Sequence, residues 1–362
     1  MKSGRIRVAT PTPRYAIEAL RGFGRSVLAA AGAGAEEAAI VTDCLLDAQL
    51  RTAPFQNQGI IRLTIYARRI REGGITPNAA TRVMRDSPSA ALLDGGNGFG
   101  QVVAHRAMTL AIAKARATGA AAVAAGNSNH FGTASYFALM AARLGLVGLA
   151  LTNASPEIPP WGASVALVGT NPWSIAVPSG GEHPVVLDIS NATSGKGAIH
   201  HFAALGRTLP ADWAMDRDGR PVTDAAAASN ALLVPIGGYK GYGIALMVDL
   251  LTGGLAGGPA GPAVGSPYDF GRPQGVSHFM IALDPAAFGG AEELAVAVQD
   301  VAGQIRGATR QPGVSTIYLP GDLEWERERE ARDRGVDLPD DDAGRLRALA
   351  GELGVPFPGP AA

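Results

Sequence analysis

The sequence predicts an α/β fold, and three observations favour it. Short apolar runs alternate with stretches of helical periodicity between residues 90 and 152. The runs are continuously apolar, which is typical of strands covered on both faces of a sheet. The chain has 362 residues, enough for about two domains of roughly 150 residues each. Its 48 glycines and 25 prolines are spread between apolar segments, which indicates many tight connections and not disorder.

A helical segment opens the chain. Residues 15–31 and 36–50 carry apolar side chains at three- and four-residue spacing, as on helices with one buried face. A third helix is predicted for residues 60–71. It ends at Gly73-Gly74, where glycine can adopt the left-handed conformation that closes a helix.

The α/β pattern follows. Residues 90–93 are predicted to form a strand, residues 95–100 a glycine turn and residues 101–118 a helix. The next strand covers residues 120–125, and a polar loop with His130 leads to a helix that ends near residue 144. Another strand is predicted for residues 146–152.

The remaining predicted elements are a hairpin, a long helix and a strand, after which the chain returns to the N-terminal region. Strands at 171–177 and 185–188 flank Gly180-Gly181, which favours a hairpin. A long apolar helix covers residues 239–255, and a strand at 279–283 precedes a return to the first region. Charges of both signs alternate from Glu324 to Glu330, which favours a solvated helix over a binding patch. We find no internal repeat.

Composition argues against nucleic acids and membranes as partners and favours the cytoplasm as the compartment. Lys plus Arg is 31 and Asp plus Glu is 32, so the net charge of -1 provides no basic field for nucleic acid. No apolar stretch reaches the 18 residues that span a bilayer, and no signal peptide follows the basic start, so we expect no membrane partner. The single cysteine, Cys44, is expected to be buried and reduced, which fits the cytoplasm.

Two nucleotide-binding motifs and a metal site are not indicated. The chain has no G-x-G-x-x-G; glycines at 95, 96, 98 and 100 are typical of a tight turn. It also has no phosphate-binding P-loop. Of six histidines, the only adjacent pair is His200-His201, and neighbours on a helix point in different directions. We therefore predict no metal.

Polar clusters follow several apolar runs. His130 lies in the loop 127–132, and further clusters occupy residues 151–156, 169–172 and 187–188. Loops at the carboxyl ends of strands are where open α/β sheets bind ligands, so these clusters are candidates for one cleft. Each is equally compatible with ordinary turn chemistry, which Asn, Ser, Pro and Gly supply throughout proteins.

An ordered set of motifs resembles the malate/L-lactate dehydrogenase family that is distinct from the Rossmann-type enzymes. That group includes ureidoglycolate and sulfolactate dehydrogenases and piperideine/pyrroline-2-carboxylate reductases. The matching stretches cover most of the chain in the expected order: residues 94–103, 128–132, 169–172, 187–188, 210–214 with Asp216 and Gly219, and 237–243.

The resemblance implies a mixed-sheet, non-Rossmann nicotinamide-binding fold with an N-terminal helical segment, assembled as a homodimer. Residues 1–120 plus 285–362 would form the substrate and dimer domain, and residues 121–284 the nicotinamide-binding domain. His130 would be the proton donor or acceptor. The cofactor, NAD or NADP, would contact Ser128, Asn129, Ala154, Asn171, Asp188, Ile189, Ser190, Lys240 and Gly241. For Lys240 the alternative is a solvated helix start, but an ammonium beside an anionic dinucleotide has an electrostatic reason.

The departures from the family pattern concern the substrate. The family's Asp/His-Ser-His-Gly, followed by Arg and Tyr, is here Gln56-Asn57-Gln58-Gly59, followed by Arg62 and Tyr66. Asn57, Gln58, Arg62 and Tyr66 are therefore the predicted substrate-binding residues. Gln58 can form hydrogen bonds but cannot titrate. The family's Gly-Lys after Asp188 is also changed, to Gly197-Ala198 with Lys196 before it.

These residues lead to a hypothesis and two alternatives. The hypothesis is hydride transfer to the C=N or C=O carbon beside a carboxylate, with Arg62 pairing with the carboxylate and a cyclic imine acid favoured by loss of the family histidine. The first alternative is a redox-inactive or repurposed family member, because Asn57-Gln58 replaces the Ser-His pair. The second is a non-enzymatic assembly protein, which would have no nucleotide affinity.

Overall fold

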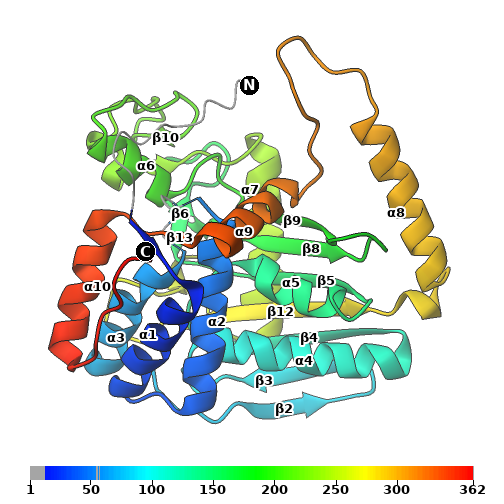
Figure 1. The fold of residues 1–362 in the computed structure, drawn as a ribbon, viewed down its shortest axis with the longest axis horizontal. Helices are drawn as coiled ribbons and strands as arrows, with labels where there is room; N and C mark the ends of the chain where they lie inside the picture. Colours follow the sequence, from blue (N-terminus) through cyan, green and yellow to red (C-terminus); the bar gives the residue numbers. More distant parts are fainter. Residues whose placement is uncertain (1–12, 54–55, 57, 362) are drawn as a thin grey trace.

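The computed structural model describes residues 13–53, 56 and 58–361, and it centres on a seven-stranded mixed sheet (Figure 1). The strand order is β2-β3-β4-β12-β5-β8-β9. Strands β3 and β4 are parallel, and every other neighbouring pair is antiparallel. The predicted α/β class and mixed sheet are confirmed. The strands are β2 (Arg82–Asp86), β3 (Ala90–Asp94), β4 (Ala120–Ser128), β12 (Val276–Leu283), β5 (Val147–Thr152), β8 (Trp173–Val177) and β9 (Val185–Ile189).

Helices cover both faces of the sheet. α4 (Gly100–Thr118) and α5 (Ala134–Ala142) lie across one face, and their alanine-rich buried sides form the main core with β4, β5 and β12. α7 (Tyr239–Asp249) and the π-helical turn η4 (Leu250–Gly254) pack against the other face. Cys44 is buried in the main core, as predicted.

The two ends of the described chain form a second core. It contains α1 (Ile17–Ala30), α2 (Ala35–Arg51), η2 (Ile60–Arg62), α3 (Leu63–Glu72) and α10 (Asp340–Leu353). Strand β1 (Arg14–Tyr15) pairs with β13 (Val336–Asp337), so the chain returns to its start as predicted. Helix α3 ends at Gly73, whose φ of 89° is left-handed. The sheet joins β2 and β3 to strands from residues 121–284, and the predicted division into domains stays a prediction.

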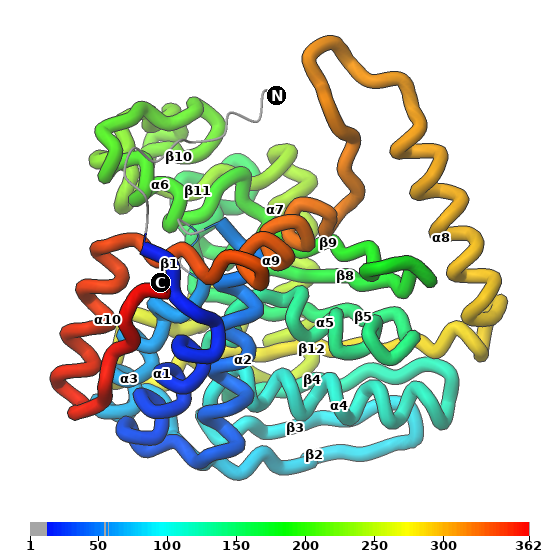
Figure 2. Tube along the Cα trace, in the orientation of Figure 1, coloured from blue at the N-terminus to red at the C-terminus, as the bar shows by residue number. Residues whose placement is uncertain are grey.

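A small lobe sits above the sheet edge in Figures 1 and 2. It has its own core, which includes Ile158, Ile199 and Leu233. Its elements are β6 (Pro156–Ile158), β7 (Val168–Gly169), α6 (Lys196–Ala204), β10 (Ala214–Met215), η3 (Ala227–Asn230) and β11 (Leu232–Leu233).

Several features differ from the predictions or were not predicted. Strand β2 was missed because all five of its residues are exposed, so it has no apolar alternation. The predicted helix 239–255 changes from α to π geometry at Leu250. α8 (Ala291–Arg306) was also missed and runs beside the sheet as a separate arm (Figure 2). α9 (Asp322–Arg334) is the predicted charged helix and is mainly exposed, but Glu328 is buried. Short 3-10 turns occupy Gly261–Ala263 and Pro285–Ala287.

Among the residues that the structure describes, no helix has both the length and the apolarity needed to cross a membrane.

Candidate functional site

The predicted polar clusters share one edge of the sheet. β4 and β5 both run antiparallel to β12, and β5 and β9 both run antiparallel to β8. Their carboxyl ends therefore point the same way. His130 follows β4, Ala154 follows β5, Asp188 lies at the end of β9, and Asn171 precedes β8 at the same edge. The topology brings together residues that are up to 58 positions apart (130 to 188).

The loop that carries His130 is anchored by Asn129. This side chain is fully buried and donates hydrogen bonds to the carbonyl groups of Asn97 and Gly98, at 3.1 and 2.8 Å. Its oxygen accepts a hydrogen bond of 3.1 Å from Arg69. A Cβ at Gly100 would lie 2.0 Å from the Asn129 carbonyl oxygen, so only glycine at this position lets the start of α4 approach the His130 loop. The loop is therefore rigidly positioned.

Three side chains form a hydrogen-bonded chain that ends at His130. Gln101 on α4 donates to the Tyr66 hydroxyl oxygen at 2.7 Å, and that hydroxyl lies 2.8 Å from His130 Nδ1. Burial raises the pKa of Tyr66 to about 12, so its hydroxyl stays protonated at neutral pH. Because its oxygen accepts from Gln101, its hydrogen is directed to Nδ1. The neutral imidazole then carries its own hydrogen on Nε2.

The surroundings of His130 disfavour a positive charge. Burial lowers the pKa of His130 well below 6.5, and the charges of Arg62 and Arg69 lower it further. Its backbone N–H donates to Gln274 Oε1 at 2.9 Å. His130 is therefore a positioned, neutral imidazole at pH 7 before any ligand is bound.

The predicted substrate residues are only partly assembled around this centre. Tyr66 contacts His130 directly, and Arg62 is buried at the start of α3, within electrostatic reach of both rings. Gln58 is half-buried, and its Oε1 is fully enclosed without a hydrogen-bond partner among the described residues. Asn57 lies outside the described residues.

Ser128 has a structural partner beneath the loop. Its side chain is fully buried, and its hydroxyl lies 2.9 Å from His278 Nε2, while Thr152 lies 2.9 Å from Nδ1 of the same ring. His278 stacks on Phe131 with ring centroids 4.8 Å apart. Burial lowers the pKa of His278 to about 3, so it stays neutral. This group ties β4, β12 and β5 together below His130.

Asn171 and Ala154 also show turn chemistry. Asn171 has a left-handed φ of 39°, which asparagine tolerates better than most residues. Its oxygen accepts the Ala154 N–H at 2.9 Å, and its Nδ2 donates to the Ala245 carbonyl group at 2.8 Å. Both polar ends of Asn171 are thus engaged within the protein. A cofactor contact by Ser128, Asn129, Ala154 or Asn171 stays a prediction.

Asp188 lies exposed at the edge, and its Oδ2 accepts the backbone N–H of Ser135 at 2.8 Å. This contact places the carboxylate at the positive N-terminus of α5. The next two residues, Ile189 and Ser190, are half-buried. Lys196, two places before the changed Ala198, donates instead to the carbonyl groups of Ser229 and Ala231 at 3.0 and 2.8 Å.

The start of α7 provides backbone donors for an anion. Gly237 and Gly238 have φ angles of 61° and 66°, and no side chain caps the helix. Lys240 is exposed in the first turn. A Cβ at Gly241 would lie 2.3 Å from the Ile236 carbonyl oxygen, so this glycine is required for packing. An uncapped helix start beside a lysine fits a phosphate group.

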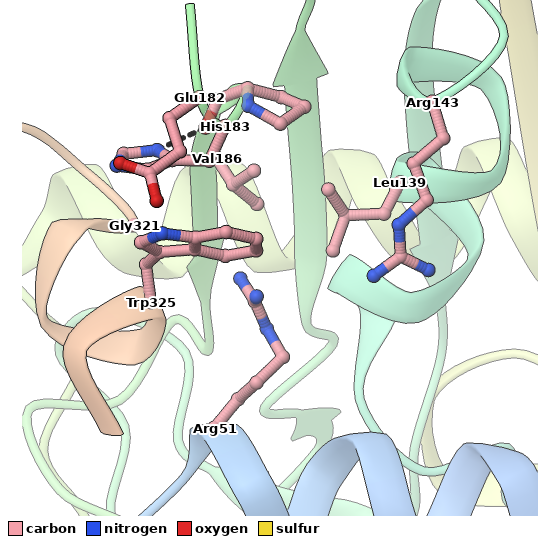
Figure 3. A pocket seen from close by; sticks show the side chains of 9 residues that line it. Arg51, Leu139, Arg143, Glu182, His183, Val186, Gly321 and Trp325 are labelled. Atoms are coloured by element: carbon pink, nitrogen blue, oxygen red, sulfur yellow. Dashed lines mark hydrogen bonds between the residues drawn. The ribbon is translucent and has the colours of Figure 1, made fainter. Parts of the chain in front are cut away.

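A cavity of about 110 Å³ lies farther along β9 (Figure 3). Arg51 rises from α2 toward Trp325 on α9, and Leu139 and Arg143 face it from α5. Arg51 donates to Glu328 at 2.9 Å, with both side chains 5% exposed. The charge of Arg51 also reaches Asp188, which connects the cavity electrostatically to the sheet edge.

No group of three or more metal-ligating side chains occurs among the described residues. No sequence pattern marks Gln101 or Gln274 as neighbours of His130. Nor did it single out Glu157, a half-buried carboxylic acid on β6 within electrostatic reach of Arg62. These residues meet only because separate elements pack at one edge.

Comparison with known proteins agrees with this geometry. Residues 15–347 match the malate/L-lactate dehydrogenase family. Malate dehydrogenase of Pyrococcus abyssi is 36% identical over 304 residues, covering 82% of this chain and 83% of that protein. The NAD(+)-dependent ureidoglycolate dehydrogenase of Escherichia coli O157:H7 is 32% identical, covering 87% and 89%. The NADP(+)-dependent (2R)-3-sulfolactate dehydrogenase of Chromohalobacter salexigens is 35% identical, covering 90% and 94%.

Solved structures show the same fold. Malate dehydrogenase from Entamoeba histolytica superposes with a TM-score of 0.91 at 30% identity, covering 96% of this chain and all of that chain (100%). The delta1-piperideine-2-carboxylate reductase from Pseudomonas syringae gives a TM-score of 0.83 at 28% identity, covering 94% and 100%. The resemblance read from the sequence motifs is confirmed. The chain belongs to the malate/L-lactate dehydrogenase family and is a dehydrogenase.

Proposed function

We propose that this dehydrogenase transfers hydride to the C=N or C=O carbon beside a carboxylate, with His130 as the proton donor or acceptor. The observation that carries the proposal is the chain Gln101–Tyr66–His130, which fixes an imidazole within electrostatic reach of Arg62. A buried guanidinium is suited to pair with a carboxylate, and a fixed imidazole is suited to handle one proton.

The cofactor is NAD or NADP, as the names of the relatives indicate. When bound, the reduced nicotinamide supplies the hydride. The uncapped start of α7 fits the pyrophosphate, with Lys240 beside it. The N–H of Gly241 donates to the Ile236 carbonyl group at 2.9 Å, so Gly241 would contribute a close approach of the backbone to the cofactor. Asp188, Ile189 and Ser190 border the cofactor at the same sheet edge, next to the loops that hold Ser128, Asn129, Ala154 and Asn171.

Substrate binding prepares His130 for proton transfer. Before binding, the charge of Arg62 helps to keep the pKa of His130 low. A substrate carboxylate beside Arg62 would compensate that charge and raise the pKa of His130, so that the ring can hold the additional proton. The imidazolium then donates from Nε2 to the oxygen that becomes negative during carbonyl reduction.

Gln58 favours a cyclic imine acid over a simple 2-oxo acid. Its amide replaces a titratable group of the family pattern, and its buried Oε1 has no partner among the described residues. A protonated imine needs no strong acid at the accepting bond. The second candidate, a family member without redox turnover, rests on the same changed pair, Asn57-Gln58.

Titration of the purified protein with NADH and NADPH, followed by fluorescence, tests cofactor binding. A panel of 2-oxo acids and cyclic imine acids then tests turnover. We expect binding and oxidation of the cofactor with cyclic imine acids. Brisk reduction of 2-oxo acids alone would contradict the preferred substrate class. A protein that binds cofactor, lacks turnover and gains it in N57S/Q58H would support the second candidate.

We also propose a homodimer, with α8 in the interface. Three apolar side chains of α8 (Val296, Val301 and Ile305) are exposed, by 60%, 55% and 38%, on an arm that a single chain leaves uncovered. A second copy is the occupant, because two identical arms related by a two-fold axis can cover each other. Sedimentation should give a dimer for the wild type and for S26E, an exposed control on α1, and a monomer for V301E. A monomeric wild type would contradict this assignment.

The compartment we propose is the cytoplasm, because Cys44 is free and buried and is the single cysteine of the chain.

A further inference from the structure

Glu157 faces away from the core of its own lobe. Strand β6 pairs with β7, with Pro156 opposite Gly169 and Ile158 opposite Val168. Ile158 is fully buried in the lobe core, and side chains alternate along a strand. Glu157 therefore points to the other side of β6. It is half-buried and forms no hydrogen bond or ion pair within the part of the chain that the structure describes.

Glu157 lies three residues after Ala154, at the sheet edge that also carries His130. Two cations on different elements are within electrostatic reach of it. Lys196 lies at the start of α6, where the carbonyl groups of Ser229 and Ala231 hold its ammonium. Arg62 lies on η2. Burial raises the pKa of Glu157, and the charges of Lys196 and Arg62 oppose this rise. A carboxylate kept half-buried without a direct partner is costly, which points to a role in binding.

Arg62 connects Glu157 to His130. Its charge acts on His130 and Tyr66 as well as on Glu157. The groups that act on the charge of His130 are all basic (Arg62, His278 and Arg69), and the two arginines are cationic. These cations suit a carboxylate but repel a positively charged group. A substrate that carries both charges therefore needs an anionic partner near Arg62, and Glu157 is a carboxyl in that position.

We infer that Glu157 is a specificity-determining residue that accepts a hydrogen bond from a protonated nitrogen of the substrate, beside the carboxylate that Arg62 holds. The preferred substrate class is then the cyclic iminium carboxylates. The inference rests on the proposed function. A 2-oxo acid has no such N–H group, so Glu157 would only repel its carboxylate.

Reduction of an iminium carboxylate needs one hydride and one proton. A hydride, which carries two electrons, forms a C–H bond at the carbon of the C=N bond. The π electron pair of that bond becomes the lone pair of nitrogen, and the nitrogen keeps its hydrogen. The amine then takes one proton from water and becomes an ammonium group, while the oxidised nicotinamide leaves. The N–H group faces Glu157 before and after the step.

Binding of a matched pair of unreactive probes tests the inference without turnover. Piperidine-2-carboxylate has a protonated ring nitrogen, and tetrahydropyran-2-carboxylate has an ether oxygen in its place. Calorimetry on the protein saturated with reduced cofactor, which cannot accept hydride from the first probe, should show tighter binding of that probe, by about 10- to 100-fold, since hydrogen bonds to charged groups are worth roughly 1.5–3 kcal/mol. The preference should fall to within about threefold in E157Q and persist in the exposed control E352Q.

Kinetics gives the second measurement. In E157Q, kcat/KM for a six-membered cyclic imine acid should fall about 10- to 100-fold, whereas kcat/KM for a 2-oxo acid should stay unchanged or rise. Equal loss for both substrates, or equal binding of both probes by the wild type, would overturn the inference and leave the dehydrogenase intact. Probe preference without any turnover would instead contradict the proposed function and retain the role of Glu157.

Discussion

The His130 centre and the Arg51 cavity handle charge in opposite ways. Around His130, burial and two arginines keep the imidazole neutral, and its contacts are hydrogen bonds between uncharged side chains. Around Arg51, the buried groups are ionised and paired. Although burial opposes it, hydrogen bonds from Arg332 and Arg51 lower the pKa of Glu328.

The His130 centre can change its charge, whereas the ion pair at the Arg51 cavity stabilises the fold. A neutral imidazole with a lowered pKa can take up a proton when the charges around it change. The ion pair of Arg51 with Glu328 joins α2 to α9 across 277 positions of sequence (51 to 328), and any change of charge there breaks the pair. The comparison predicts that substitutions in the two regions affect different quantities.

The largest effect is expected for His130→Asn. For a 2-oxo acid, loss of the proton donor should lower kcat by about 10²- to 10⁴-fold, because general acid catalysis contributes that much in other enzymes. For a cyclic iminium acid, which needs no acid at the accepting bond, kcat should fall less. Fluorescence titration should show unchanged cofactor affinity. The control His200→Asn alters an exposed histidine on α6. Loss of less than threefold in kcat for the 2-oxo acid would show that His130 is not the proton donor.

Glu328→Gln should act on stability instead. It leaves Arg51 buried without its anion, so the free energy of unfolding should fall by about 3–5 kcal/mol, while kcat below the transition temperature stays within twofold. Urea unfolding measures the first quantity. Glu330→Gln, on the exposed side of α9, should change stability by less than about 0.5 kcal/mol. If both variants are equally stable, the cavity does not hold α9 in place.

The pH dependence of stability separates the two regions further. The folded-state pKa of His278 is about 3 against 6.5 for the free side chain, so the unfolded chain binds more protons between these values. The free energy of unfolding should therefore fall with decreasing pH below 6.5, by roughly 1.4 kcal/mol per pH unit from this residue. The lowered pKa of His130 acts in the same direction, whereas Glu328 begins to lose its charge only below 4.5.

Urea midpoints at pH 7.0, 6.0 and 5.0 measure this slope. His278→Gln should flatten it, at the cost of a lower stability at pH 7, and His200→Gln should leave it unchanged. A slope that is the same in both variants would mean that the acid sensitivity arises elsewhere than beneath the His130 loop.

The smallest effect is expected for Tyr66→Phe. Removing one hydrogen bond to His130 should lower kcat for a 2-oxo acid about tenfold, equivalent to roughly 1.4 kcal/mol. The Tyr66 hydroxyl stabilises the neutral imidazole, so its loss should also raise the pKa of His130 and shift that limb of the kcat/KM profile to higher pH. Tyr318→Phe, at a partly exposed position, is the control. A lower kcat without a shifted profile would indicate a packing role alone.

The local sequence pattern was sufficient to predict many elements of the fold. Helical spacing predicted α1 to α5 within a few residues, and the Gly-Gly turn predicted the hairpin of β8 and β9. It failed for β2, because an exposed edge strand has no buried face to mark it. It also misjudged Glu328, which looks like any solvated charge until Arg51 is placed opposite it.

Some features of the candidate site were also predictable from the sequence, and others were not. The sequence by itself determined the α/β class, the family and the position of His130 in a loop after a strand, because periodicity, turn residues and ordered motifs are local properties. Only the tertiary structure decided that Gln101 and Tyr66 orient His130, that Asn171 is engaged in a turn and that Glu157 comes within electrostatic reach of Arg62. These contacts join residues far apart in sequence, and their geometry depends on how helices pack at the sheet edge.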